Sequence, residues 1–252
     1  MKYFFGKWPQ IKKKLETTKN VFLFFDYDGT LTPIVRKPKL AKLDRKVKEL
    51  LKKLSGKFKV AVISGRPLRE VKKFVGLKNI IYSGNHGFEI EIQPQIFIHP
   101  EAEKIRPEIQ RIKRIIEQKT TGIKGSWIED KGLVISIHWR CVDKKHSPKL
   151  LTIIHSAIRN NSRVRLTKGK KVWEIRPNID WHKGKAVRFI LSLLPTPYSL
   201  LPVFIGDDTT DEDAFKALRS GITIRICKSN KSSARYYLKN QSEILRFLKI
   251  LN

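Results

Sequence analysis

The sequence contains few cysteines and no long uninterrupted apolar run. Its 252 residues include two cysteines, Cys141 and Cys227, which lie far apart and form no CxxC pair. We therefore expect no structural disulfide and no cysteine zinc site. A reducing, cytoplasmic location fits this cysteine usage. The segment 189–206 carries no charge and approaches the length of a membrane span, but Pro195, Pro197 and Pro202 interrupt it. We therefore expect no membrane association.

Acidic residues are also scarce relative to basic ones. The chain has 53 Lys and Arg against 23 Asp and Glu, which gives a formal net charge of +30. Such a charge raises nucleic-acid binding as an alternative function, which would show as binding that weakens steeply with salt. The basic residues are spread along the whole chain, however, and no separate basic tail is present. Nucleic-acid binding is therefore the less favoured hypothesis.

The stretch from Val21 to Leu31 combines a predicted buried strand with reactive side chains. Its five successive large apolar residues, 21–25, are typical of a strand covered on both faces in a parallel sheet. Asp26 and Asp28 follow at the carboxyl end of this strand, where such sheets bind ligands. Two close carboxylates repel unless a cation lies between them, which predicts a hard metal ion such as Mg²⁺. The simpler alternative is an ordinary Asp-Gly turn.

Strand, polar turn and helix alternate on both sides of a segment with a different pattern. Apolar strands at 58–63, 79–82 and 201–205 each end in a polar turn, with helical periodicity between them. This alternation predicts an α/β fold with a doubly wound, mostly parallel sheet in residues 1–99 and 180–252. Residues 100–179 instead show helix, two strands, helix, two strands. They predict an inserted α+β domain with hairpins.

Side chains suited to phosphoryl transfer follow several predicted strands. A carboxylate can attack phosphorus to form an acyl phosphate, and we assign this role to Asp26. Asp28 would protonate the departing alkoxide and later deprotonate the attacking water. Mg²⁺ would be held by Asp26, the main-chain carbonyl of Asp28 and Asp207. Ser64, Lys185 and backbone amides of the turns would bind the phosphoryl oxygens.

Each of these residues has a simpler explanation when it is considered alone. The acidic run 207–213 is able to cap the helix expected near Asp211, with Thr210 or Asp211 as the cap. Ser64 fits a helix cap, and Lys185 fits an ordinary exposed lysine. It is their joint occurrence in this order that favours phosphoryl transfer.

These segments resemble the motifs of haloacid dehalogenase-like phosphatases: Asp26-Tyr-Asp28-Gly-Thr30, Ser64-Gly65-Arg66, Lys185 and Gly206-Asp207-Asp208-x-x-Asp211. The likeness spans nearly the entire predicted core, and residues 100–179 look like the α/β cap of the sugar-phosphate branch. Further segments are similar to trehalose-6-phosphate phosphatases: 84–87, 138–140, 169–177 with Glu174-x-Arg176-Pro177, and the Lys183-Gly-Lys-Ala186 that follows. The resemblance implies Mg²⁺ held by Asp26, Asp28, Asp207, Asp208 and Asp211. It also implies these substrate-binding residues: Thr30, Gly65, Arg66, Asn85, His86, His138, Lys170, Glu174 and Arg176.

The activity implied by the resemblance is hydrolysis of trehalose 6-phosphate to trehalose and phosphate, with a trehalose-6-phosphate synthase as a candidate partner. Its alternatives are sucrose 6-phosphate, mannosylglycerate phosphate, glucosylglycerol phosphate, or phosphoryl transfer to another acceptor. Glu174 and Arg176 also fit an exposed cross-strand ion pair, and His86 and His138 fit structural histidines. Asp180-Trp-His182, between the Arg-Pro and Lys-Gly-Lys pieces, departs from the family's usual spacing.

Overall fold

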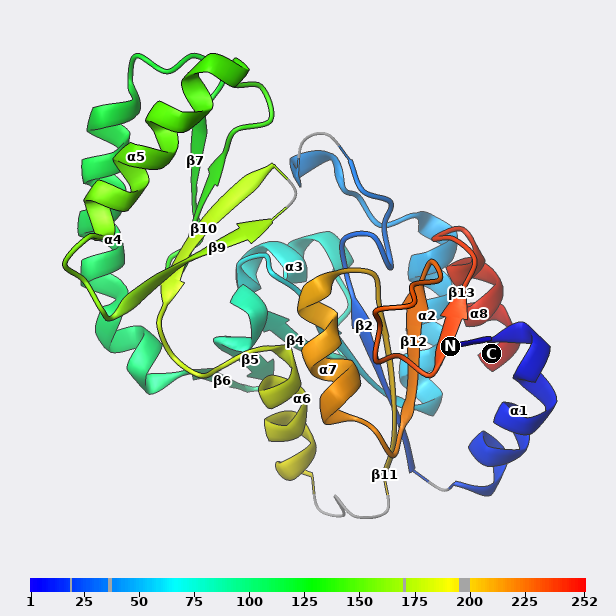
Figure 1. Ribbon diagram of the computed structural model, residues 1–252. Helices are drawn as coiled ribbons and strands as arrows, with labels where there is room; N and C mark the ends of the chain where they lie inside the picture. Colours follow the sequence, from blue (N-terminus) through cyan, green and yellow to red (C-terminus); the bar gives the residue numbers. More distant parts are fainter. Residues whose placement is uncertain (19, 36–37, 170, 195–199) are drawn as a thin grey trace. The chain divides into compact units, whose positions relative to one another are not determined.

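The computed structural model describes residues 1–18, 20–35, 38–169, 171–194 and 200–252. Its internal contacts divide the chain into two units (Figure 1). The core unit comprises Met1–Phe97 and Trp181–Asn252, and the inserted unit comprises Ile98–Asp180. The boundaries predicted after residues 99 and 179 lie within two residues of these.

The core unit is organised around one sheet with the strand order β1-β13-β12-β11-β2-β3-β4-β5-β6. Successive neighbours from β1 to β4 run parallel, and β5 pairs antiparallel with β4. This confirms the mostly parallel α/β sheet. The strands are β1 (Lys2–Tyr3), β2 (Asn20–Asp26), β3 (Lys59–Ile63), β4 (Ile81–Gly84), β5 (Glu89–Ile92), β6 (Gln95–Ile98), β11 (Leu200–Gly206), β12 (Ile222–Ile226) and β13 (Tyr236–Leu238).

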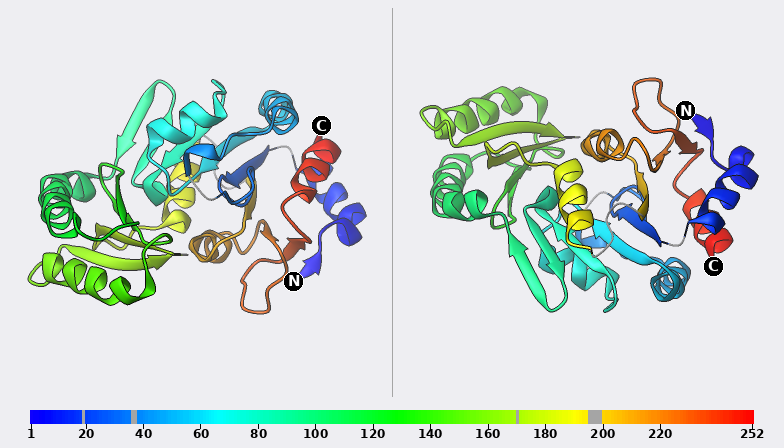
Figure 2. Two further views of the ribbon diagram at one scale, coloured as in Figure 1. Left: turned by 90° about the horizontal axis from the view of Figure 1, so that it is seen from above. Right: turned by 90° about the horizontal axis from the view of Figure 1, so that it is seen from below.

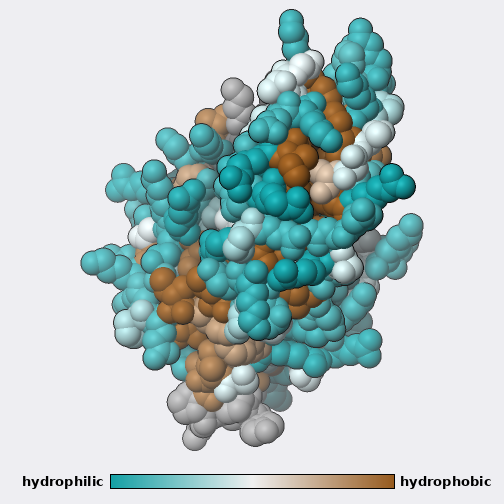
Figure 3. All heavy atoms as spheres, turned by 90° about the vertical axis from the view of Figure 1, so that its left-hand side faces the viewer, coloured by the Kyte–Doolittle hydropathy of each residue, from teal (hydrophilic) through white to brown (hydrophobic). Residues whose placement is uncertain are grey.

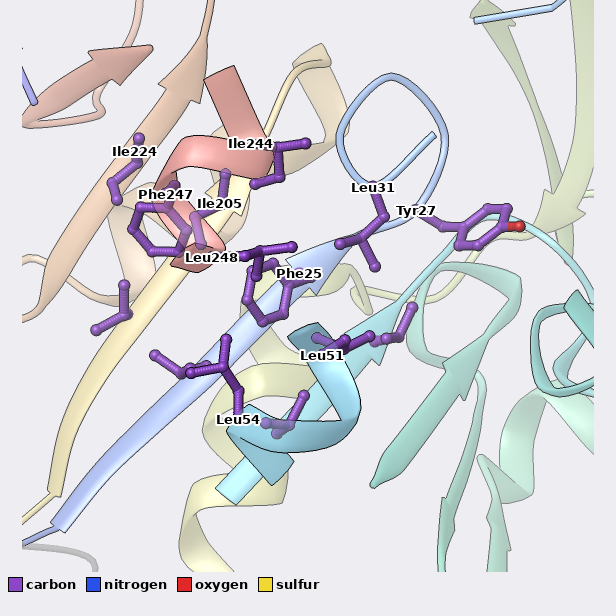
Figure 4. Packing of buried hydrophobic residues seen from close by; sticks show 14 of the residues in the cluster. Phe25, Tyr27, Leu31, Leu51, Leu54, Ile205, Ile224, Ile244, Phe247 and Leu248 are labelled. Atoms are coloured by element: carbon purple, nitrogen blue, oxygen red, sulfur yellow. The ribbon is translucent and has the colours of Figure 1, made fainter. Parts of the chain in front are cut away.

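Strand β2 lies in the middle of this sheet and is buried on both faces. Leu23 and Phe25 belong to a cluster with α2 (Arg45–Lys57), α3 (Leu68–Val75) and α8 (Glu243–Leu251). Figure 4 shows Phe25 between side chains of α2 and α8. Phe22 and Phe24 pack on the opposite face with α6 (Lys183–Ser192) and α7 (Glu212–Ala217). The apolar run does not alternate because helices cover both faces of this strand, as the sequence predicted (Figure 2).

Local sequence signals account for several helix ends, but one Ser-Gly pair does not end its helix. Asp44 precedes α2 and accepts hydrogen bonds from the backbone N–H groups of Lys46 and Val47 at 2.8 and 3.3 Å. Gly76 ends α3 in the left-handed region, at φ +60°. A Ser-Gly pair is typical of a helix end, but Ser55-Gly56 lies inside α2, which continues to Lys57. The Ser55 hydroxyl donates to the Lys52 carbonyl at 2.8 Å, which satisfies it inside the helix.

The inserted unit has the predicted order of helix, two strands, helix, two strands. Its sheet has the order β7-β8-β10-β9, and all of its pairs are antiparallel. The isoleucines of α4, together with Leu150 and Ile154 of α5, pack on the face that carries Trp173 and Ile175. The other face of this sheet carries polar side chains. The elements are α4 (Pro100–Thr120), β7 (Trp127–Asp130), β8 (Ile135–His138), α5 (Ser147–Ile158), β9 (Val164–Gly169) and β10 (Val172–Pro177).

The surface is rich in charge. Figure 3 shows one face of the molecule, on which hydrophilic side chains predominate and apolar ones form smaller patches. Among the described helices, which also include α1 (Trp8–Thr17), none combines the length and the apolar character that a membrane crossing requires.

Candidate functional site

The carboxyl ends of β2, β3, β4 and β11 meet at one edge of the core sheet. These strands are parallel neighbours, and their register aligns Asp26 with Ile63, Ile63 with Ser83, and Ile205 with Phe25. The turns that follow each strand therefore begin at the same level of the sheet. The polar side chains predicted for this edge come from segments more than 170 residues apart in the chain, and the parallel sheet collects them.

Three carboxylates form an acidic cluster at this edge. One oxygen each of Asp26, Asp207 and Asp211 lies within 4.8 Å of the others. Asp26 and Asp211 are almost completely buried, at 5% and 0% exposure. Gly29 has φ +88°, and a Cβ at this position would lie 2.1 Å from Asp207 Oδ2. Glycine is therefore required beside the cluster, both for the left-handed turn and for the close approach of Asp207.

Lys183 provides the buried cation of this cluster. Its Nζ lies 2.6 Å from Asp26 Oδ1 and 2.6 Å from Asp211 Oδ1. Burial opposes the charged form, but the attraction of Asp211 and Asp26 outweighs it and raises the pKa of Lys183 above its ordinary value. Asp211 Oδ2 accepts the backbone N–H groups of Asp207 and Asp208, each at 3.0 Å. Both oxygens of Asp211 are therefore engaged by the protein itself.

The cluster carries more negative charge than Lys183 offsets. Burial raises the pKa of Asp26 well above its ordinary value, against the attraction of Lys183. Burial and the nearby Asp211 raise the pKa of Asp207 to about 7. Within the described part of the chain, Asp26 Oδ2 and Asp207 Oδ1 are buried without a hydrogen-bond partner. Two such oxygens in an acidic cluster fit a hard divalent cation.

Lys185 is not the lysine of this cluster, and this corrects the sequence prediction. Residues 183 and 185 are two positions apart on α6, a rotation of about 200° around the helix axis, so they point in different directions. Lys183 reaches the acidic cluster. Lys185 instead lines a cavity of about 310 Å³ between α6 and α7, whose other lining residues are His182, Gly184, Arg188, Asp213, Lys216 and Ala217. The sequence Lys-Gly-Lys contains two candidate lysines for the cluster. The structure shows that Lys183, the first residue of α6, is the one that contacts it.

Asp208 also departs from its predicted role as a metal ligand. Its side chain is exposed, and its Oδ1 accepts the backbone N–H of Thr209 at 2.7 Å. Asp208 is the N-cap of the short 3-10 helix η6 (Thr209–Asp211) and forms a capping box with Asp211. The acidic run therefore does cap a helix, as the alternative held. Asp208 and Asp211 share the capping box of η6, and Asp211 also occupies the N-cap position of α7 (Glu212–Ala217), without a side-chain cap hydrogen bond there. Asp207 and Asp211 are the members left for the cluster.

Asp28 lies beside the acidic cluster in sequence but has a different partner. Arg66, expected to bind substrate, donates from Nε to Asp28 Oδ2 at 2.7 Å and from Nη2 to Asp28 Oδ1 at 2.6 Å. The Asp28 side chain is 40% exposed, whereas that of Arg66 is 7% exposed. Asp28 is therefore accessible to a ligand, and Arg66 reaches it from the protein side. The predicted contact of the Asp28 carbonyl with a metal stays a prediction.

The turns after β3 and β4 are joined to each other. Ser64 Oγ accepts the backbone N–H of Arg66 at 3.1 Å, and the Ser64 carbonyl accepts that of His86 at 3.0 Å. Asn85 and His86 have positive φ values, and the His86 ring lies against Gly65. The Asn85 side chain is fully buried and donates to Glu89 Oε2 at 2.7 Å, and its predicted substrate contact stays a prediction. Thr30 is likewise fully buried.

The inserted unit brings His138, Glu174 and Arg176 to the polar face of its sheet. Register aligns Glu174 with Ser136, and Ser136 with Glu129. Glu174 Oε1 accepts Ser136 Oγ at 2.8 Å and Lys131 Nζ at 2.9 Å. His138 Nε2 lies 2.9 Å from Glu129, and its ring stacks on Trp127 at 3.8 Å. The alternative of an exposed ion pair does not describe Glu174, because it pairs with Lys131 and the two side chains are only 13% and 10% exposed. Lys170 lies outside the described residues.

Comparisons with known proteins agree with this architecture. The trehalose-phosphatase family model matches residues 24–242. Trehalose-phosphate phosphatase B of Arabidopsis thaliana is 37% identical over 249 residues, which cover 92% of this chain and 66% of that protein. Probable trehalose-phosphate phosphatase 4 of Oryza sativa subsp. japonica is 37% identical over 91% of this chain and 65% of its own length. The chain thus spans slightly less than two thirds of the length of these relatives.

A solved structure shows the same fold. The C-terminal domain of the C. albicans trehalose-6-phosphate phosphatase matches with a TM-score of 0.81 and 25% identity, over 96% of both chains. The fold and the strand-end cluster are those of the haloacid dehalogenase-like phosphatases. Within that class, the chain belongs to the trehalose-phosphatase family.

The two lysines of α6 give a matched test of the site. Lys183→Met leaves Asp26 and Asp211 buried without their cation, and we expect it to lower the free energy of unfolding by about 3–5 kcal/mol. Lys185→Met lies on the same helix outside the cluster, and we expect a loss below about 1 kcal/mol. Urea denaturation followed by circular dichroism measures both. Equal losses would contradict the assignment of Lys183.

Proposed function

We propose that this protein is a phosphatase that hydrolyses trehalose 6-phosphate to trehalose and phosphate. The observation that carries the proposal is the acidic cluster around Lys183, at the edge where parallel sheets bind ligands. Membership of the trehalose-phosphatase family supports the choice of substrate. The relatives named above carry the same activity in their names, and their greater length leaves the activity of this chain to experiment.

Asp26 is the proposed nucleophile. One of its oxygens attacks phosphorus, the bond from phosphorus to the sugar oxygen breaks, and an aspartyl phosphate forms. Asp28 donates its proton to the departing sugar oxygen, which keeps the electron pair of the broken bond. Asp28 then takes a proton from a water that attacks the same phosphorus, which releases phosphate and restores Asp26. Lys183 holds Asp26 in place and offsets part of the negative charge on the transferred group.

A divalent cation fits the site, and we propose Mg²⁺. Asp26 and Asp207 would hold it through the oxygens that lack a partner among the described residues, with Asp211 nearby. When bound, the ion supplies positive charge next to the phosphoryl oxygens. Asp211 orients this set through Lys183 and through the backbone N–H groups of Asp207 and Asp208.

The polar face of the inserted unit supplies groups suited to a sugar. Trehalose is a neutral disaccharide whose hydroxyl groups require hydrogen-bonding partners, and we propose that Glu174, Arg176 and His138 provide them. Glu174 is already oriented by Ser136 and Lys131, so its carboxylate is fixed before a ligand arrives. A cytoplasmic location and a trehalose-6-phosphate synthase partner stay predictions.

The nucleophile is tested with Asp26→Asn. We expect this variant to fold, because the amide is nearly the same size, and to release phosphate at less than about one thousandth of the wild-type rate. The measurement is phosphate release from trehalose 6-phosphate in the presence of Mg²⁺. Asp44→Asn, at the cap of α2, is the control and should keep wild-type turnover. Substantial turnover by Asp26→Asn would refute the aspartyl-phosphate mechanism.

The dependence of metal binding on pH follows from Asp207. Its pKa of about 7 exceeds the ordinary value, so its contribution to stability is complete below about pH 4 and is lost as pH rises through about 7. Because a cation binds the deprotonated carboxylate, lowering the pH from 8 to 5.5 should weaken Mg²⁺ binding about 30-fold. Thermal unfolding with and without Mg²⁺ measures this as a larger stabilisation at pH 8. Asp207→Asn should abolish the stabilisation at both pH values, and its persistence would place the ion elsewhere.

The sugar is tested with Glu174→Gln and a panel of phosphates. If Glu174 contacts the sugar, the variant should raise KM for trehalose 6-phosphate about 10-fold or more and leave p-nitrophenyl phosphate hydrolysis nearly unchanged. Wild-type rates on sucrose 6-phosphate and glucosylglycerol phosphate complete the comparison. Equal kcat/KM values across the panel would refute the trehalose assignment and leave the phosphatase chemistry standing.

A further inference from the structure

We infer that Arg66 is the positioning residue of the general acid, holding the Asp28 carboxylate ready for proton transfer, and that it does not bind the phosphoryl group. The inference rests on the proposed function and adds a role that the substrate-binding prediction for Arg66 did not contain. It follows from three features of the structure: the two-pronged contact with Asp28, the way Arg66 itself is fixed, and the number of its donors already in use.

The contact between the two side chains has a defined geometry. Nε and Nη2 of Arg66 each donate to a different oxygen of Asp28, at 2.7 and 2.6 Å. Such a paired contact fixes the plane of the carboxylate as well as its distance, which a single hydrogen bond or a lysine cannot do. Asp28 has two rotatable side-chain bonds and is 40% exposed, so it needs an external restraint to keep one orientation.

Arg66 is in turn held from several sides. Its Nη1 donates to Glu70 Oε2 at 3.1 Å, and its Nη2 also donates to the Pro38 carbonyl at 2.9 Å. The guanidinium carbon lies 5.5 Å from the centre of the Tyr27 ring and 4.9 Å from that of Phe74. Packing on these rings adds attraction and excludes other orientations. Arg66 is therefore a rigid support for Asp28.

The donors of Arg66 are nearly all committed. A guanidinium has five N–H donors, and the contacts with Asp28, Glu70 and Pro38 use four of them. A residue that binds a phosphoryl group in two-pronged fashion needs two free donors on one side of the guanidinium. The arrangement thus favours support of Asp28 over contact with phosphate.

The chemical consequence concerns the leaving group. A sugar alkoxide leaves poorly unless Asp28 delivers a proton to it as the bond to phosphorus breaks, and this requires a donor within about 3.2 Å of the oxygen. A displacement of 1 Å costs about 100-fold in rate. p-Nitrophenolate leaves without a proton. Loss of Arg66 should therefore matter for a sugar phosphate and matter little for p-nitrophenyl phosphate.

The test measures kcat/KM of Arg66→Ala on trehalose 6-phosphate and on p-nitrophenyl phosphate. This parameter covers the steps up to departure of the leaving group, so hydrolysis of the aspartyl phosphate does not enter it. We expect a loss of about 100-fold on the sugar phosphate and less than about 10-fold on the aryl phosphate. Asp28→Asn should show the same pattern, and adding Arg66→Ala to it should cost less than about 3-fold more, because both act in one step.

Two further variants keep the result interpretable if Arg66→Ala folds poorly. Arg66→Lys keeps the charge but loses the two-pronged contact, and we expect it to lose about 10-fold or more on the sugar phosphate alone. Arg69 is exposed on α3, the helix that follows Arg66, and Arg69→Ala should match the wild type on both substrates. Retained aryl phosphate turnover reports that a variant is folded.

The outcomes that would contradict the role of Arg66 differ from those that would contradict the proposed function. Equal losses on both substrates, with weaker inhibition by inorganic phosphate, would show that Arg66 binds the phosphoryl group and would overturn the inference. If trehalose 6-phosphate proves to be the wrong sugar, any alkyl phosphate that the wild type hydrolyses replaces it, because the comparison depends on the leaving group. A wild type inactive on alkyl and aryl phosphates alike would overturn both the proposed function and the role of Arg66.

Discussion

The buried contact of Lys183 with Asp26 and Asp211 is the constraint on which the site depends. Burying Asp26 and Asp211 beside the partly buried Asp207 is strongly unfavourable unless a cation is buried with them. Lys183 reaches both partners from the first turn of α6, so the position of this helix is fixed by charge as well as by its apolar face. Asp211 then fixes the backbone of the turn that carries Asp207. One lysine thus joins β2, α6 and the end of β11.

The sequence predicts those parts of the fold that are decided by nearest neighbours along the chain. The unbroken apolar run 21–25 could be buried only by helices on both faces, and it lies at the centre of the sheet. The change from single strands to strand pairs at residue 100 marked the inserted unit to within two residues. Asp26 and Asp207 were predicted because each directly follows such a strand. In these cases the residue types favoured by the local sequence pattern are also those that the tertiary structure needs at these positions.

Other features escaped the sequence because they depend on helix phase or on distant partners. Lys183 and Lys185 point about 200° apart around α6, and the Lys-Gly-Lys sequence does not show which of them faces the sheet edge. Asp208 was predicted to be a metal ligand because the run 207–213 does not show which of its carboxylates caps the helix. Asn85 sits in a polar Gly-Asn-His-Gly turn, yet its amide is buried against Glu89. The pairing of Arg66 with Asp28, 38 residues apart, has no local signal at all.

The acidic cluster and the Arg66–Asp28–Glu70 group differ in their charge balance. In the acidic cluster, one ammonium group faces three carboxylates, so the surplus is negative and suits a cation. Such a surplus repels a phosphate ester, so under the proposed function the cation would bind before the substrate. Arg66 has Asp28 and Glu70 as its partners and adds no free positive charge. If the proposed function is right, a bound cation would supply the local attraction for a phosphate ester, and the net charge of +30 would add a long-range attraction. The basic composition, which first suggested nucleic acid, is thus equally compatible with a small anionic substrate.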